Sequence, residues 1–427
     1  MQATMLRHKT YAPNSKLPFA TLTAAVLLTA ALVPQPAHAE IRISLPSFFN
    51  FGPKSTVEMN SPGRHLRMQI RGSATFNATE DDVQTLNGKM TLQEKRNGQM
   101  RRMVFESDAG GITRTYTIDG KAQPLDADGR RWLATLLPWV IRETAFDMEK
   151  RIKRIHAAGG ADAVLAEIER IETGHARGRY IDGLSKLGAL EDRQVQRLIA
   201  AVAAMDSDFE RRSALSAVTG SQTLSTAAQV AALNVVAKMD SSFEQRSALV
   251  ALTPKLAAET TVAQAWLNAA GKIDSDFELR GAIDAIAKRE PLSSIYLDVL
   301  IEATLKLDSD FEHAAALVTI GRQLAKATPA QMNAYLKSVQ KIDSDFERKN
   351  VLVNFINRNT LDKAGILGVL QAMDGMSSGH EIRSVLSELA QRMPADSELV
   401  ARYRRAARNL NEHERGRAEK ALDHLNM

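Results

Sequence analysis

Hydrophobic and polar residues alternate with a period of two between about residues 56 and 125. The apolar positions include Leu66, Met68 and Ile70, followed by Met103 and Phe105. This period predicts β-strands, because successive side chains of a strand point to opposite faces. Dipeptides typical of two-residue hairpin turns separate the apolar runs: Asn87-Gly88, Asn97-Gly98, Gly110-Gly111 and Asp119-Gly120. We therefore expect residues 40–125 to form an antiparallel meander of five or six strands.

One face of this β-rich domain is expected to be polar, as in many antiparallel sheets. The alternate positions that predict this face carry Arg67, Arg71, Arg101 and Arg114.

The period changes to that of a helix after Pro124, with Trp132, Leu136 and Val140 at helical spacing. A second helix is expected to end at Gly159-Gly160. We interpret residues 126–160 as two linking helices that form a hinge and cap the N-terminal end of the following region, with Trp132 and Trp139 as core aromatics. The basic run at residues 150–154 is either a solvated face or a site for lipid headgroups.

From residue 161 onward the chain is built from a repeat of nearly constant length. One position recurs seven times at spacings of 34, 34, 34, 34, 35 and 34: His175, Phe209, Phe243, Phe277, Phe311, Phe346 and His380. An apolar residue lies four positions before each of them: Ile171, Met205, Met239, Ile273, Leu307, Ile342 and Met376. A fixed period of this length is typical of stacked repeat architectures.

Each repeat is expected to be an αα-hairpin of a helix A and a helix B. Two apolar columns define the buried face of helix A: the one just given, and a second column six residues earlier. Helix B is expected to bury the phenylalanine column together with leucines six residues later, at Leu215, Leu249, Leu317 and Leu386. The prediction for the whole chain is an α+β fold, a small antiparallel β meander followed by an all-α solenoid of about seven hairpins over residues 161–427, ending in a capping helix.

The repeated phrase Ser-Asp-Phe-Glu predicts the start of helix B. A serine and a glutamate three positions later match the capping box, in which each side chain binds a free backbone N–H at the helix start. The matching pairs are Ser207/Glu210, Ser241/Glu244, Ser275/Glu278, Ser309/Glu312, Ser344/Glu347 and Ser378/Glu381. Removing one such serine is expected to cost about 1 kcal/mol.

The repeated helical unit resembles tetratricopeptide repeats in length and HEAT-like repeats in general form, over residues 161–425. Because the Trp, Gly, Tyr, Ala and Pro pattern of tetratricopeptide repeats is not met, we favour a HEAT-like solenoid. The repeated phrase after a β-rich module is also similar to repeats in exported bacterial proteins and in extracytoplasmic extensions of sensor-type membrane metallopeptidases. The chain lacks the HExxH motif of such peptidases, so the resemblance implies an interaction module of the cell envelope.

The charged residues of the repeated phrase are the candidate site. Stacking is expected to form a ridge from an acidic and a basic column: Asp208, Asp276, Asp310 and Asp345, with Arg212, Arg246, Arg280, Lys349 and Arg383. Three pairs within a helix are predicted, Asp208–Arg212, Asp276–Arg280 and Asp345–Lys349. The ridge is either a charge ladder that neutralises itself or an acidic groove for a basic partner, and bridging calcium ions are a further alternative. No metal, cofactor or catalytic residue is predicted.

Residues 1–39 have the layout of a cleavable export signal. Basic residues without any acid precede an apolar run from Phe19 to Val33, and Ala37-His38-Ala39 precedes Glu40. Cleavage after Ala39 is expected, and an uncleaved anchor is the alternative. Removing three bases lowers the formal net charge from +5 to +2, with 52 basic and 50 acidic residues remaining. A near-neutral exported chain is a poor candidate for binding nucleic acid.

These patterns favour a non-catalytic scaffold in the periplasm or outside the cell, with no transmembrane span after cleavage. The chain has no cysteine, which excludes disulfides and thiol chemistry. The solenoid surface is expected to bind an envelope protein or peptide, while the β domain docks to another envelope component. The alternatives are a structural or adhesive protein of the cell surface and a regulator of an envelope enzyme.

Overall fold

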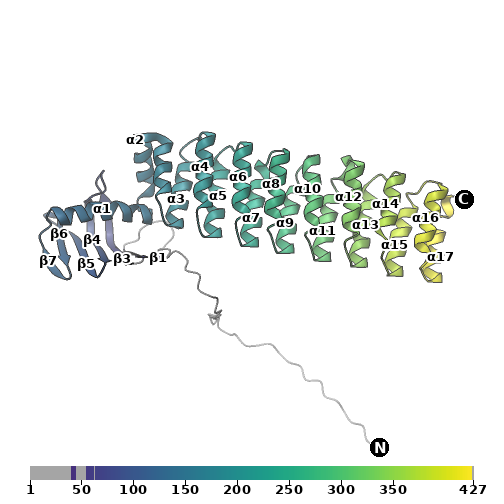
Figure 1. The fold of residues 1–427 in the computed structure, drawn as a ribbon, viewed down its shortest axis with the longest axis horizontal. Helices are drawn as coiled ribbons and strands as arrows, with labels where there is room; N and C mark the ends of the chain where they lie inside the picture. Colours follow the sequence, from purple (N-terminus) through teal and green to yellow (C-terminus); the bar gives the residue numbers. More distant parts are fainter. Residues whose placement is uncertain (1–39, 45–53, 62, 426–427) are drawn as a thin grey trace, which may run out of the picture.

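The computed structural model describes residues 40–44, 54–61 and 63–425, with a sheet at one end and a long row of helices extending from it (Figure 1). The predicted export signal, residues 1–39, lies outside the described residues. Among the described residues, no helix has the length and apolar character needed to cross a membrane.

The predicted meander is confirmed, with seven strands where five or six were expected. Every strand pairs antiparallel with the strand that precedes it. One face is apolar, since Leu66, Met68, Ile70, Met103 and Phe105 are at most 1% exposed. The strands are β1 (Glu40–Ser44), β2 (Lys54–Ser61), β3 (Arg64–Phe76), β4 (Val83–Arg96), β5 (Gln99–Asp108), β6 (Gly111–Ile118) and β7 (Lys121–Gln123).

One of the four predicted turns is wrong. Asn87-Gly88 lies inside β4, where Gly88 pairs with Gly72 of β3. Both glycines have positive φ, and a Cβ on Gly72 would lie 1.8 Å from the carbonyl oxygen of Asn87. The dipeptide therefore serves a close approach of two backbones rather than a chain reversal. The turns at Asn97-Gly98 and Asp119-Gly120 are confirmed, whereas the turn predicted at Gly110-Gly111 lies one residue earlier, at Ala109 and Gly110.

The prediction of a polar face that carries four arginines holds for only two of them. Arg67 and Arg71 are exposed on the open face. By the alternation of a strand, Arg101 and Arg114 lie on the apolar face. Each of the two forms an ion pair with a carboxylate: Arg101 lies 3.2 Å from Asp128, and Arg114 lies 2.8 Å from an oxygen of Asp82.

The helix α1 (Ala127–Thr144) forms the second layer of the β domain and is not a linker. Its buried residues share one core with the apolar face of the sheet; they are Trp132, Leu133, Leu136, Leu137, Val140 and Ile141. The Trp132 ring stacks on Tyr116, and its Nε1 donates to Glu94 at 2.7 Å. The expectation that residues 126–160 form a hinge pair is therefore corrected, because α1 is needed to cover the sheet.

The helix α2 (Met148–Glu169) begins the helical array and is kinked at Gly159 and Gly160, where the sequence predicted a helix end. A buried ion-pair network joins it to the β domain. The guanidinium of Arg151 donates to Glu80 of the β3–β4 loop at 2.8 Å and to the Tyr180 hydroxyl at 2.9 Å, and it lies 2.8 Å from Glu167. These contacts hold the two parts in a defined arrangement.

The array consists of two rows of stacked helices, which follow one another along the molecule to the C-terminus (Figure 1). The even-numbered helices α2 to α16 pack on one another as helices A, and the odd-numbered helices α3 to α17 pack on one another as helices B. The helices after α2 are α3 (Gly174–Ser185), α4 (Asp192–Ala203), α5 (Asp208–Ser221), α6 (Thr226–Val236), α7 (Ser242–Leu252), α8 (Thr260–Ala270), α9 (Asp276–Ala287), α10 (Ser294–Thr304), α11 (Asp310–Gly321), α12 (Pro329–Val339), α13 (Asp345–Arg358), α14 (Lys363–Ala372), α15 (Gly379–Ala390), α16 (Ser397–Ala407) and α17 (Glu412–Lys420). The predicted α+β fold with a helical repeat region is thus confirmed.

The predicted leucine column of helix B is buried, but the prediction that the phenylalanine column is buried with it is wrong. Leu215, Leu249, Leu317 and Leu386 are at most 1% exposed, whereas the five phenylalanines are 54–63% exposed. Residues along a helix are separated by about 100°. A phenylalanine six residues before a buried leucine therefore lies about 120° away from it around the helix, outside the core.

Candidate functional site

The acidic column of the predicted ridge links four of the repeats to the repeat that follows each of them. The Asp208 carboxylate accepts the backbone N–H groups of Asp240 and Ser241, at 2.8 and 2.9 Å. Asp276 accepts the N–H of Ser309 at 2.6 Å. Asp310 and Asp345 repeat the arrangement on the loops before α13 and α15. Each aspartate begins one helix B and binds the loop that begins the following helix B.

The basic column also pairs with the next repeat, and the three ion pairs predicted within a helix are wrong. Each base reaches the glutamate that lies three positions after the next helix B cap, which is a serine in four cases and Asn411 in the last: Arg212 pairs with Glu244, Arg246 with Glu278, Arg280 with Glu312, Lys349 with Glu381 and Arg383 with Glu414. The row is interrupted at Ala314. The glutamate lies about one repeat away in sequence but directly adjacent in the stack, because neighbouring helices B run side by side.

The predicted capping boxes are half formed. The hydroxyls of Ser207, Ser241, Ser275, Ser309 and Ser344 accept the N–H three residues later at 3.4–3.5 Å. Ser378 makes no such bond. The glutamates do not bind back to the cap N–H; in four repeats an aspartate of the preceding repeat occupies that N–H. The phrase therefore connects repeats as well as starting helices.

The charges of the ridge are consequently committed to contacts between repeats. The exposed fraction of the side chains is 15% for Asp208, 23% for Arg280 and 19% for Lys349. Within the described part of the chain, no group of three or more His, Asp or Glu residues is placed to hold a metal ion. This arrangement corresponds to the self-neutralising charge ladder among the alternatives.

A buried polar network between α10, α11 and α12 gave no signal in the sequence. The Nε2 of His313 lies 2.9 Å from the Ser338 hydroxyl, which lies 2.8 Å from the Thr304 hydroxyl. His313 is 3% exposed, and burial lowers the pKa of its imidazole. The three groups satisfy one another in the core.

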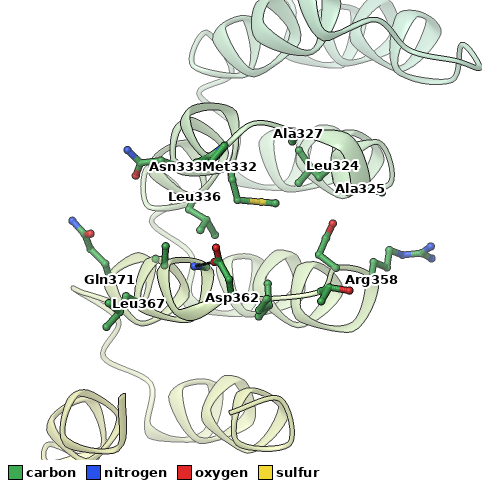
Figure 2. Close-up of a pocket in the computed structure, with 17 residues that line it drawn as sticks. Leu324, Ala325, Ala327, Met332, Asn333, Leu336, Arg358, Asp362, Leu367 and Gln371 are labelled. Carbon is green, nitrogen blue, oxygen red and sulfur yellow. Dashed lines mark hydrogen bonds between the residues drawn. The ribbon is translucent and has the colours of Figure 1, made fainter. Parts of the chain in front are cut away.

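A hollow of about 710 Å³ lies between helices α12 and α14 of the A row (Figure 2). Its apolar wall comes from both layers: Leu324, Met332 and Leu336 on one side, and Leu361 and Leu367 on the other. Figure 2 shows Met332 and Leu336 directed from α12 toward the layer that contains α14. We call this hollow the α12–α14 pocket.

The pocket coincides with the irregular step of the repeat. In most repeats the same number of residues separates the phenylalanine of helix B from the residue that caps the next helix A. This holds for Phe209 and Ser225, for Phe277 and Ser293, and for Phe346 and Asp362. Phe311 and its cap Thr328 are one position further apart. The additional residue of the longer unit therefore lies between Phe311 and Thr328. This segment contains the short 3₁₀ turn Leu324–Lys326, which forms part of the pocket wall.

Polar groups surround the opening of the pocket. Arg358 is exposed and has no ion-pair partner among the described residues. Asp362 caps α14 by accepting the N–H of Gly365 at 2.8 Å, while Asn333 and Gln371 are exposed. An apolar hollow with a few polar groups at its mouth suits an apolar side chain or small apolar group that carries an acidic neighbour. Sequence analysis missed this site, although the irregular spacing marked its position.

No family of known proteins matches the chain, and no curated protein matches it. One solved structure with some likeness is described as "Computational Design of Self-Assembling Cyclic Protein Homooligomers". The two chains are 14% identical, and the match covers 67% of this chain and 94% of that chain with a TM-score of 0.14. Neither the fold of the array nor its function follows from this likeness.

Proposed function

We propose that the protein is a non-catalytic scaffold of the bacterial envelope, periplasmic or secreted after cleavage at Ala39, whose HEAT-like solenoid binds a protein or peptide. The observation that carries the proposal is the α12–α14 pocket. It lies where the repeat is one residue longer, and its wall is apolar on both sides.

The chemistry of the pocket indicates what the bound segment contributes. An apolar side chain fills the space between Met332, Leu336 and Leu367, removing apolar surface from water. An acidic group beside that side chain reaches Arg358, whose guanidinium has no other ion pair among the described residues. The stack from α5 to α17 supplies a rigid support, because an aspartate or glutamate contact described above joins each of these helices B to the next.

The test is a comparison of two alanine-to-tryptophan variants in matched positions. Ala364 and Ala227 are both exposed second residues of a helix A, but only Ala364 lines the pocket. The full chain and each variant are crosslinked in native cells, purified, and their bound proteins identified by mass spectrometry.

Ala364→Trp is expected to block the pocket and abolish capture of a partner that Ala227→Trp retains, with circular dichroism unchanged in both. A partner captured equally by both variants would place binding elsewhere on the molecule. Absence of any reproducible partner would contradict the scaffold function.

A further inference from the structure

The exposed phenylalanines form a row along one edge of the array, which we call the phenylalanine ladder: Phe209, Phe243, Phe277, Phe311 and Phe346. Each is the second residue of a helix B and lies two positions after the serine that caps that helix. Neighbouring helices B pack on one another, so the axes of the helices that carry successive rings are about 8–10 Å apart. His175 and His380 continue the row at its two ends and are also exposed.

Three of the five rings of the ladder each have a basic group close to the ring. The Arg212 guanidinium lies 5.2 Å from the centre of the Phe209 ring, the Arg280 guanidinium 5.5 Å from that of Phe277, and the Lys349 ammonium 4.4 Å from that of Phe346. These three bases are themselves fixed by glutamates of the next repeat. These three rings are thus preordered, and they lose little side-chain freedom when they are covered.

The area of the ladder corresponds to what a dimer needs. The rings are 54–63% exposed, and an aromatic side chain buries about 150–250 Å². Five half-exposed rings therefore offer roughly 600 Å² in one copy and about 1,200 Å² in two, which reaches the 1,200–2,000 Å² of stable interfaces before any neighbouring residue is counted.

The loops beside the ladder carry both signs of charge. Four loops each contain an exposed lysine and an exposed aspartate without an ion-pair partner among the described residues: Lys238 and Asp240, Lys272 and Asp274, Lys306 and Asp308, Lys341 and Asp343. This edge therefore has little net charge to repel an identical edge, and it favours neither a strongly basic nor a strongly acidic partner.

We propose that the phenylalanine ladder is a self-association surface, on which a second copy of this chain packs ladder against ladder. A second copy has the same step between rings, so contact extends over the whole row. Because interfaces between identical chains are most often two-fold and self-complementary, the expected assembly is a dimer. The proposal is independent of the α12–α14 pocket, which lies on the A row.

The first test is the mass of the purified full chain by sedimentation velocity, from about 1 to 100 µM, a range that covers dimers of moderate affinity. The expected mass is twice that of the same chain in denaturant. The variant with Phe243→Ser, Phe277→Ser and Phe311→Ser is expected to be a monomer with unchanged circular dichroism, since these rings lie outside the core. The control with Leu187→Ser and Met100→Ser removes apolar groups that are exposed away from the ladder and is expected to remain dimeric.

A second test uses the absence of cysteine from the chain. Phe277 is the middle ring of five, so it meets its own counterpart whether the two ladders run parallel or antiparallel. Phe277→Cys is expected to give a crosslinked dimer with a short bis-maleimide, and Leu187→Cys is expected to give none. The proposal would be overturned by a wild-type chain that is monomeric or by a triple serine variant that stays dimeric. It would also be overturned if Phe277→Cys formed a dimer that the bis-maleimide does not crosslink. The proposed function is tested separately, by partner capture with the Ala364→Trp and Ala227→Trp variants, so either proposal can fail without the other.

Discussion

Asp310 of one repeat accepts the backbone N–H of Ser344 of the next repeat at 2.8 Å. Ser344 in turn caps α13 by accepting the N–H of Glu347. The two bonds connect the start of one helix B to the start of the following one. Both bonds recur at Asp208 and Asp276, and at Asp345 the bond to the next repeat recurs without the serine cap, so the repeated phrase sets both the helix start and the stacking of neighbours.

The first prediction compares the two aspartates of one triplet. Asp310→Ala is expected to lower the free energy of unfolding by about 1–3 kcal/mol, because it leaves the N–H groups of Asp343 and Ser344 without their acceptor. Asp308→Ala is expected to change it by less than about 0.5 kcal/mol, since the Asp308 side chain is exposed and has no partner among the described residues. Urea unfolding of both variants decides the matter, and equal losses would refute the link between repeats.

The second prediction concerns the ion pair between Arg212 and Glu244 of adjacent repeats, whose side chains are 26% and 12% exposed. A double-mutant cycle with Arg212→Met and Glu244→Gln is expected to give a coupling free energy of about 1 kcal/mol, which falls at high salt because the pair is partly exposed. A cycle between Asp208 and Arg212 is expected to show a smaller coupling. A larger coupling free energy between Asp208 and Arg212 than between Arg212 and Glu244 would show that the pair predicted within the helix is the correct one.

The third prediction addresses the junction of the β domain and the array. Arg151→Met is expected to destabilise the protein by about 3–5 kcal/mol, because the buried carboxylates of Glu80 and Glu167 lose their main cation. Arg154→Met is the control, since Arg154 also contacts Glu80 but is 43% exposed. Limited proteolysis between residues 144 and 160 is expected to increase only in Arg151→Met, and similar cleavage in both would argue against a fixed junction.

The fourth prediction is a pH dependence caused by His313. Burial lowers the pKa of this histidine in the folded state, while the unfolded chain has a pKa near 6.5. Above about pH 6.5 neither state binds the proton; below it the unfolded state gains the proton first, so the free energy of unfolding falls as the pH decreases.

The matched variant is His313→Gln, which introduces the residue that another repeat already buries at the equivalent position, Gln245. Urea unfolding between about pH 7.5 and 5 is expected to show a smaller loss of stability for His313→Gln than for the wild type. Parallel pH profiles of the two proteins would show that His313 does not carry the effect.

The repeat, its caps and the leucine column could be predicted because they depend on local spacing. The exposure of Phe277 could not be recognised from a column of apolar residues alone, although its six-residue distance from the buried position already places it about 120° away around the helix. The partners of Arg280 were misassigned because Asp276 lies four residues away in the same helix, while Glu312 becomes a neighbour only once the repeats are stacked.

The pocket shows a different limit of the sequence. The single additional residue between Phe311 and Thr328 is visible as one longer spacing, but a one-residue insertion can lengthen a turn, bulge a helix or open a gap. Only the packing of Leu324, Met332 and Leu336 against the next layer shows that it borders an open hollow.

The central claim, that the solenoid binds a protein segment at the α12–α14 pocket, is tested most directly by photocrosslinking in native cells. A photoreactive phenylalanine analogue is placed at Ala364, and at Ala227 in the control, and covalent adducts are identified by mass spectrometry. The account predicts one defined protein adduct at Ala364 that is absent at Ala227. No adduct at Ala364, or the same adducts at both positions, would contradict it.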